Sequence, residues 1–106
     1  MFLEVLKQDK TNIEANFKIG HCYLNSTFNH KAEQYLVLAY TYNRDYDPEI
    51  RRDVAYAKQL NHKFEEAIKF YELEKTVLDP KKDAYLDAEV DKHIYECNNG
   101  IEFMAN

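Results

Sequence analysis

The sequence predicts an all-α protein of about five antiparallel helices that ends in a long C-terminal helix. Three observations predict this fold class. The 106-residue chain contains two Gly and two Pro against nine Tyr and six Phe, so it has few turn residues and many large core-forming rings. Apolar residues recur every three to four positions along most of the chain. The segment from Ile13 also repeats in the segment from Pro48.

The first repeat divides into two predicted helices. Thr11 followed by Glu14 is a capping-box pattern, which predicts that a helix begins here and runs to about Asn25. The polar cluster of residues 25–27 ends that helix, and Asn29 is the predicted N-cap of the next one. The apolar face of this second helix comprises Ala32, Tyr35, Leu36, Ala39 and Tyr42.

The second repeat follows a predicted turn at residues 43–47. Asp47-Pro48 and Asp79-Pro80 each combine a capping aspartate with a proline suited to the first helical turn, so both mark predicted helix starts. A break at Asn61-His62 separates two helices between them. Their apolar residues are Ile50, Val54, Ala57 and Leu60 in one, and Phe64, Ala67, Ile68 and Tyr71 in the other.

The last predicted helix runs from Asp83 to the C-terminus. Its apolar stripe is Leu86, Val90, Ile94, Cys97, Ile101 and Met104. Gly100 is expected to weaken its last turns, since Gly costs a helix about 1 kcal/mol relative to Ala. The expected organisation is one domain over residues 1–106: residues 1–10 as the tail of a preceding helix, 11–45 and 46–80 as the two repeats, and 81–106 as a capping helix. Residues 1–10 carry Phe2, Val5 and Leu6 on one side and suggest a piece of a longer protein.

The two units resemble the tetratricopeptide (TPR) repeat, a helix–turn–helix of about 34 residues. Ile19, Gly20 and Tyr23 match the family's first helix, Ala32, Leu36 and Ala39 match its second, and the second unit matches at Ala55, Phe64, Ala67 and Tyr71. The chain departs from the pattern at Asn16, where Trp is frequent, at Lys58, where Tyr is usual, and at Glu74, where a small residue is usual. The resemblance implies an α-solenoid in which Gly20 and Ala32 let paired helices approach closely.

A narrower resemblance is to the N-terminal TPR region of Bacteroidetes OmpA-family envelope proteins, some of which serve type IX secretion and gliding. It is carried by NFKIGHCYLNS, KFEEAIKFYE and EVDKHIYECNNGIEF. This resemblance implies the N-terminal module of a larger, periplasmic, outer-membrane-associated protein. A cytoplasmic location is the alternative.

The resemblance also implies a protein–protein interaction scaffold that is not an enzyme and that binds a peptide or helix of a partner in its concave groove. Rings and aliphatic side chains flanked by charges suit such capture. Phe17→Ala or Tyr56→Ala is expected to weaken partner binding without loss of helix content. The groove positions carried over from the family are Glu14, Phe17, His21, Leu24, Asn25, Glu49, Arg52, Tyr56, Gln59 and Leu60.

Charge and hydropathy limit the other classes of partner. The formal charge is −5 and the basic residues are scattered, which disfavours nucleic-acid binding. No stretch approaches the roughly 18 consecutive apolar residues of a membrane span, so this fragment is not expected to insert into a membrane.

Asp83, Asp87 and Asp91 form an acidic stripe on the last helix, interpreted as a solvated face, with docking of a basic partner as the alternative. An alternative function is self-association, with a homodimer formed through the N-terminal edge.

Catalytic and metal chemistry finds little support in the sequence. His21 and Cys22 are adjacent on a helix and therefore point about 100° apart, which prevents a nucleophile–base pair. His93 and Cys97 could offer two metal ligands on successive turns and form the enzyme or metal alternative, but they have no evident third partner. Cys22 and Cys97 are interpreted as small buried or half-buried hydrophobic residues, with a disulfide between them as the alternative. No catalytic residue, metal site or cofactor is expected.

Overall fold

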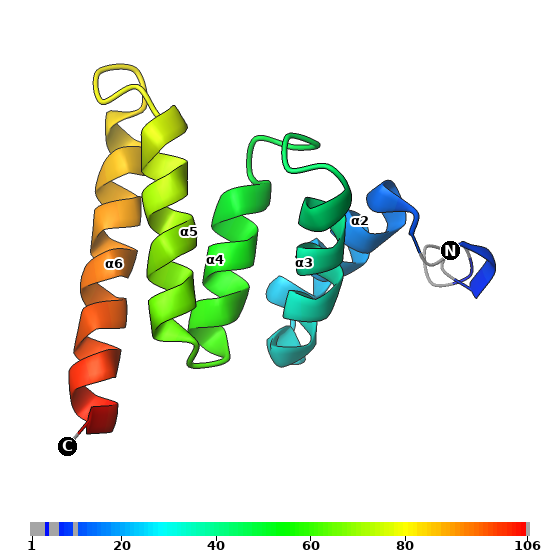
Figure 1. Ribbon diagram of the computed structural model, residues 1–106, viewed down its shortest axis with the longest axis horizontal. Coiled ribbons are helices and arrows are strands. Elements are labelled where there is room, and N and C mark those ends of the chain that lie inside the picture. Colours follow the sequence, from blue (N-terminus) through cyan, green and yellow to red (C-terminus); the bar gives the residue numbers. More distant parts are fainter. Residues whose placement is uncertain (1–3, 5–6, 10, 106) are drawn as a thin grey trace.

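The computed structural model describes residues 4, 7–9 and 11–105, and every regular element within them is a helix. In chain order these are α2 (Ile13–Leu24), the short 3₁₀ turn η1 (Asn29–Lys31), α3 (Ala32–Tyr42), α4 (Ile50–Leu60), α5 (Phe64–Val77) and α6 (Ala84–Ala105) (Figure 1). The predicted all-α fold class is therefore confirmed. The predicted apolar side at Phe2, Val5 and Leu6 lies outside the described residues, as does much of the N-terminal edge.

Each α-helix packs on the α-helix that follows it, and α2 also contacts α4. Helices α3 to α6 stand in a row in Figure 1, and α4, α5 and α6 alternate in direction. The principal extents are 42 × 37 × 21 Å. Because a helix with its side chains is about 10–12 Å across, the shortest dimension corresponds to two helices. The array is thus two helices deep, with α2 and α4 as neighbours.

The first core cluster forms where α2 and α3 meet and extends to α4. A Cβ atom on Gly20 would lie 2.6 Å from Cγ of Leu36, closer than side chains approach, and Leu36 itself is fully buried. The predicted close approach at Gly20 is therefore confirmed. The buried members of this cluster are Phe17, Leu24, Ala32, Leu36, Ala39, Ile50, Val54 and Ala57.

The second core cluster joins α4, α5 and α6. Its buried members are Ala55, Ala67, Tyr71, Val90 and Cys97. Gly100 has a packing role that the sequence did not reveal, because a Cβ atom there would lie 2.6 Å from the ring of Phe64. Helix α6 continues through Gly100 to Ala105. Tyr42 and Met104, predicted on apolar faces, are 52% and 63% exposed because each lies in the last turn of its helix.

The predicted caps of the first repeat are wrong in detail. Asn12, not Thr11, caps α2, since its side-chain oxygen accepts a hydrogen bond from the backbone N–H of Ala15 at 2.8 Å. The Thr11 hydroxyl instead donates to Asp9 at 2.7 Å. Asn29 begins a 3₁₀ turn and does not cap α3, whose N-terminus has no side-chain cap.

The Asp79-Pro80 pair also differs from its prediction, because it forms a turn ahead of α6. Asp79 Oδ1 accepts from the N–H of Lys81 at 2.9 Å, while the Asp79 N–H donates to Asp83 Oδ2 at 2.9 Å. These bonds close a turn before the helical ladder starts, so α6 begins at Ala84.

The three departures from the TPR pattern are all buried polar residues. Asn16, Lys58 and Glu74 are 1%, 7% and 1% exposed. Asn16 donates to the backbone carbonyl of Asn12 at 2.9 Å, and Glu74 accepts from Arg52 Nε at 2.6 Å. A buried polar group is costly unless it is hydrogen-bonded, so each departure depends on the hydrogen bonds that it makes.

Lys58 lies within a network around Glu33. Its Nζ donates to Glu33 Oε2 at 3.0 Å and to Glu66 Oε1 at 2.9 Å. Lys63 Nζ and Asn61 Nδ2 also donate to the Glu33 carboxylate, each at 3.0 Å. The network ties the start of α3 to the turn between α4 and α5, and so joins the α2–α3 hairpin to the α4–α5 hairpin.

Acid is expected to destabilise the fold through Glu33. Burial favours a higher pKa, but the bonds from Asn61, Lys58 and Lys63 outweigh it and lower the pKa of Glu33 to about 2. A lowered folded-state pKa contributes stability that is fully present above the unfolded value, near 4.5, and is lost as the pH falls toward 2. We expect Glu33 to account for a loss of about 2–3 kcal/mol in the free energy of unfolding over that range.

Urea unfolding at a series of pH values, followed by circular dichroism, measures this loss. Glu33→Gln should remove its share of the acid sensitivity. Glu65→Gln, at an exposed position on α5, serves as the matched control and should leave the pH dependence unchanged. An acid-induced loss of the same size in Glu33→Gln as in the wild type would rule out this role for Glu33.

Candidate functional site

A hollow of about 400 Å³ lies between α2 and the start of α4. We call it the α2–α4 hollow. Four of the predicted groove residues line it: Phe17, His21, Glu49 and Arg52. The full lining is Phe17, Lys18, His21, Asp47, Pro48, Glu49 and Arg52. The structure thus brings part of the predicted groove together at one place.

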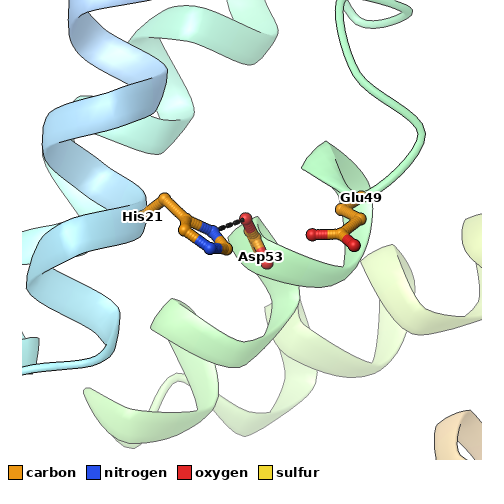
Figure 2. A group of neighbouring side chains, drawn as sticks. All are labelled: His21, Glu49 and Asp53. Carbon is orange, nitrogen blue, oxygen red and sulfur yellow. Dashed lines mark hydrogen bonds and ion pairs between the residues drawn. The ribbon is translucent and has the colours of Figure 1, made fainter.

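The Asp47-Pro48 turn sets the position of the acidic residues at this hollow. Asp47 Oδ1 accepts from the N–H of Glu49 at 2.8 Å, and the Asp47 carbonyl accepts from the N–H of Ile50 at 3.1 Å. The Glu49 carbonyl then accepts from the N–H of Asp53 at 2.9 Å, the first bond of the helical ladder. Glu49 and Asp53 therefore lie one turn apart, on the side of α4 that faces α2 (Figure 2).

His21 reaches from α2 to this acidic pair. Figure 2 shows its ring directed at Asp53, and His21 Nδ1 donates to Asp53 Oδ2 at 2.9 Å. The ring also stacks on Phe17 with a centroid separation of 5.9 Å. Burial raises the pKa of Asp53 above its usual value, although the bond from His21 opposes that shift. One ligand atom from each of His21, Glu49 and Asp53 lies within 4.8 Å of the other two.

Negative charge is in excess around the α2–α4 hollow. Asp47, Glu49 and Asp53 contribute three carboxylates, while Arg52 donates to the buried carboxylate of Glu74 and so has its own partner. Lys18 is exposed and has no ion-pair partner among the residues that the structure describes. The hollow therefore combines an acidic side with a single uncommitted cation.

The remaining first-repeat groove residues divide between core and surface. Phe17 and Leu24 are 5% and 9% exposed and belong to the first core cluster. Glu14 and Asn25 are exposed. Phe17→Ala is therefore expected to damage the core, which corrects the prediction that this substitution would leave the helices intact.

The remaining second-repeat groove residues do not line the α2–α4 hollow. The ring of Tyr56 packs against His93 of α6 at 5.5 Å between centroids and is 38% exposed. Gln59 accepts from the Tyr71 hydroxyl at 2.7 Å, and Leu60 packs against the first core cluster. These three residues mainly hold α4 against its neighbours.

A larger hollow, of about 500 Å³, was missed by the sequence interpretation. We call it the α3 hollow. Three of its charged groups are already engaged, since Lys58 and Lys63 both contact Glu33, while Lys31 is exposed with its Nζ 5.3 Å from the Phe28 ring centroid. Its lining is His30, Lys31, Glu33, Gln34, Val37, Leu38, Thr41, Lys58, Asn61 and Lys63.

Of the His93–Cys97 pair, Cys97 belongs to the second core cluster, and His93 contacts Tyr71 of that cluster. Cys97 is fully buried, and burial raises the pKa of its thiol to about 11, so it stays protonated at neutral pH. The His93 ring stacks on Tyr71, with a centroid separation of 5.3 Å and an interplanar angle of 4°. Cys22 is exposed, contrary to its prediction, and both cysteines are free.

The predicted acidic stripe on α6 is partly neutralised from α5. Lys75 Nζ donates a hydrogen bond to Asp91 Oδ1 and lies 3.8 Å from Asp87 Oδ1. Asp83 accepts from the N–H of Asp79 at 2.9 Å. Only Asp91 of the three is exposed, so the stripe is less solvated than expected.

Comparisons of the chain with protein-family models, with curated proteins and with solved structures give no match. The resemblances to the TPR family and to OmpA-family proteins thus stay predictions. Within the residues that the structure describes, no helix combines the length and the apolar character needed to cross a membrane.

Proposed function

We propose that this chain is a TPR-like protein-interaction module that binds a peptide or helix of a partner protein across α2 and the start of α4. The single observation that carries the proposal is the α2–α4 hollow, where four predicted groove residues from two repeats line one surface. Its role is binding, not catalysis. By resemblance, the module belongs to a periplasmic, outer-membrane-associated protein, with a cytoplasmic adaptor as the alternative.

The lining of the hollow indicates what kind of segment fits. Exposed Pro48 offers apolar surface beside the edge of the buried Phe17 ring, while Lys18 lies on the α2 side and Glu49 at the start of α4. A suitable ligand is an extended or helical segment with an apolar anchor, an acidic residue toward Lys18 and a basic residue toward Glu49. Apolar anchors supply most of the affinity of such complexes, and the charges set register.

The α3 hollow is larger, but three of its four charged side chains are engaged with one another. Glu33, Lys58 and Lys63 satisfy one another within it. A ligand that recruited these three charges would have to break bonds that hold the two hairpins together, which leaves buried charge unpaired and is costly. The uncommitted Lys18 and the exposed Glu49 favour the α2–α4 hollow.

Charge reversal at the hollow tests the proposal. Peptides selected from a displayed random library on the wild-type chain are measured by fluorescence anisotropy against variants. Lys18→Glu should weaken binding at least about tenfold, because it replaces an attraction by a repulsion of like charges. Gln34→Glu, an exposed position lining the α3 hollow, is the matched control and should bind normally.

Equal affinity of every selected peptide for Lys18→Glu and for the wild type would remove the α2–α4 hollow as the binding surface. If Gln34→Glu alone weakened binding, the peptide would bind at the α3 hollow instead. Tyr56→Ala adds a third measurement and tests whether the binding surface continues along α4 toward α6.

A further inference from the structure

We infer that His21, Glu49 and Asp53 form a binding site for a divalent first-row transition metal ion, with Zn²⁺ as the reference ion. From the sequence, the alternative of a metal site was limited to His93 and Cys97, which have no evident third partner. The inferred site lies elsewhere, between α2 and α4. It does not depend on partner binding.

The distances suit coordination by a single ion. Zn²⁺ binds imidazole nitrogen and carboxylate oxygen at about 2.0–2.2 Å, which places neighbouring ligand atoms roughly 3–3.5 Å apart. His21 Nδ1 and Asp53 Oδ2 are 2.9 Å apart, and the three ligand atoms all lie within 4.8 Å of one another. Glu49 is exposed, so its side chain can rotate toward the pair, and a small side-chain movement at His21 or Asp53 widens their 2.9 Å separation to the coordination distance.

The protonation chemistry of the pair also permits binding. His21 Nδ1 now carries the proton of its bond to Asp53, whereas a metal needs that nitrogen's lone pair. A neutral imidazole can hold its proton on Nε2 instead. The metal then takes the place of the proton between Nδ1 and Asp53 Oδ2. The ring stays neutral and no group changes oxidation state.

The charge around the site favours a cation. Asp47 adds a third carboxylate nearby, the Arg52 guanidinium is held by Glu74, and Lys18 is the one uncommitted cation among the described residues of the hollow. Two carboxylates and one neutral imidazole neutralise a divalent ion. Three protein ligands leave one position open in a tetrahedral site, as in zinc sites that keep water or another ligand. His21 and Glu49 line the hollow, so the open position faces it.

Isothermal titration with ZnCl₂ tests the inference on chelator-treated, dialysed protein. The wild-type chain should bind one Zn²⁺ ion saturably. His21→Gln and Glu49→Gln should each weaken binding at least about tenfold, since loss of groups that merely support a ligand already costs 10–100-fold. Cys22→Ser and His93→Gln are matched controls that remove the exposed thiol and the other half-buried imidazole, and both should bind as the wild type does.

A second readout separates coordination from misfolding. Co²⁺ in place of Zn²⁺ should give visible absorption bands whose intensity reports the ligand set, and Zn²⁺ should raise the melting temperature of the wild type but not of Glu49→Gln. Because Glu49 is exposed, its variant decides the question if His21→Gln loses helix content. No saturable binding, or binding that survives both ligand variants and is lost in Cys22→Ser or His93→Gln, would overturn the site.

Discussion

Replacing Leu36 by alanine is expected to lower the free energy of unfolding by about 3 kcal/mol. Leu36 is fully buried in the first core cluster and fills the space beside Gly20 where α2 and α3 meet. Truncation removes apolar contacts and leaves a cavity that two packed helices cannot close. Urea unfolding followed by circular dichroism measures the change.

A double-mutant cycle with Gly20→Ala makes this prediction specific to the contact. Alone, Gly20→Ala forces a Cβ atom to within 2.6 Å of Leu36 Cγ, and overpacking of this kind costs about 1–3 kcal/mol, partly offset by the better helix propensity of Ala. Combined with Leu36→Ala, the new methyl enters vacated space. The double variant should therefore lose at least about 1 kcal/mol less free energy of unfolding than the sum of the losses in the two single variants.

Gly100→Ala provides the control for this cycle. Its Cβ atom would meet Phe64, which packs against the second core cluster. Its effect should add to that of Leu36→Ala, because the two sites share no side-chain contact. Simple additivity at Gly20 as well would mean that Gly20 and Leu36 do not face each other.

Lys58→Met is the second large expected effect, with a loss of about 3 kcal/mol in the free energy of unfolding. The substitution keeps an apolar chain of similar length but removes the ammonium group, which contacts Glu33 and Glu66. Because the Glu33 and Lys58 side chains are 11% and 9% exposed, breaking the pair leaves a nearly buried carboxylate with fewer partners. Such losses are about 3–5 kcal/mol in fully buried pairs, and Lys63 and Asn61 retain some compensation here.

Two comparisons isolate the buried charge. Lys75→Met removes a cation that is 33% exposed from a pair whose Asp91 is 56% exposed, and it should cost no more than about 1 kcal/mol. The double variant Lys58→Met with Glu33→Met replaces the buried pair by apolar groups and should recover most of the loss. If Lys58→Met and Lys75→Met were equally mild, the network around Glu33 would not hold the hairpins together.

Helix positions could be predicted because their signals are local. The break at Asn61-His62, the turn before α4 and the spacing of Ile50, Val54 and Ala57 depend on residues within a few positions of one another. The caps were less predictable, because Asn12 and Thr11 are adjacent and the side-chain oxygen of either can accept a hydrogen bond from the first turn of a helix. The competing bond from Thr11 to Asp9 decides between them.

Features that depend on distant partners could not be predicted. Lys58 and Glu74 were identified as departures from a pattern, but the residues near them in the sequence do not indicate that each is buried. The partner of Lys58 at Glu33 lies on another hairpin. In the same way, Asp53 received no role because only the approach of α2 to α4 places it beside His21.

The groove was predicted in part for the same reason. Family positions selected one face of each first helix, and four of the ten residues line the α2–α4 hollow. Phe17 and Leu24 turn into the core because α2 is covered by both α3 and α4. The sequence of one helix alone does not indicate whether a residue on a given face lines the groove or packs against the next helix.

Amide chemical-shift mapping with a library-selected peptide tests most directly whether a partner lies across α2 and the start of α4. In ¹⁵N-labelled protein, we expect the largest shifts at residues 17–21 and 47–53, with smaller changes elsewhere in the chain. Shifts centred on residues 30–41 and 58–63 would place the ligand in the α3 hollow and would contradict the proposed binding surface.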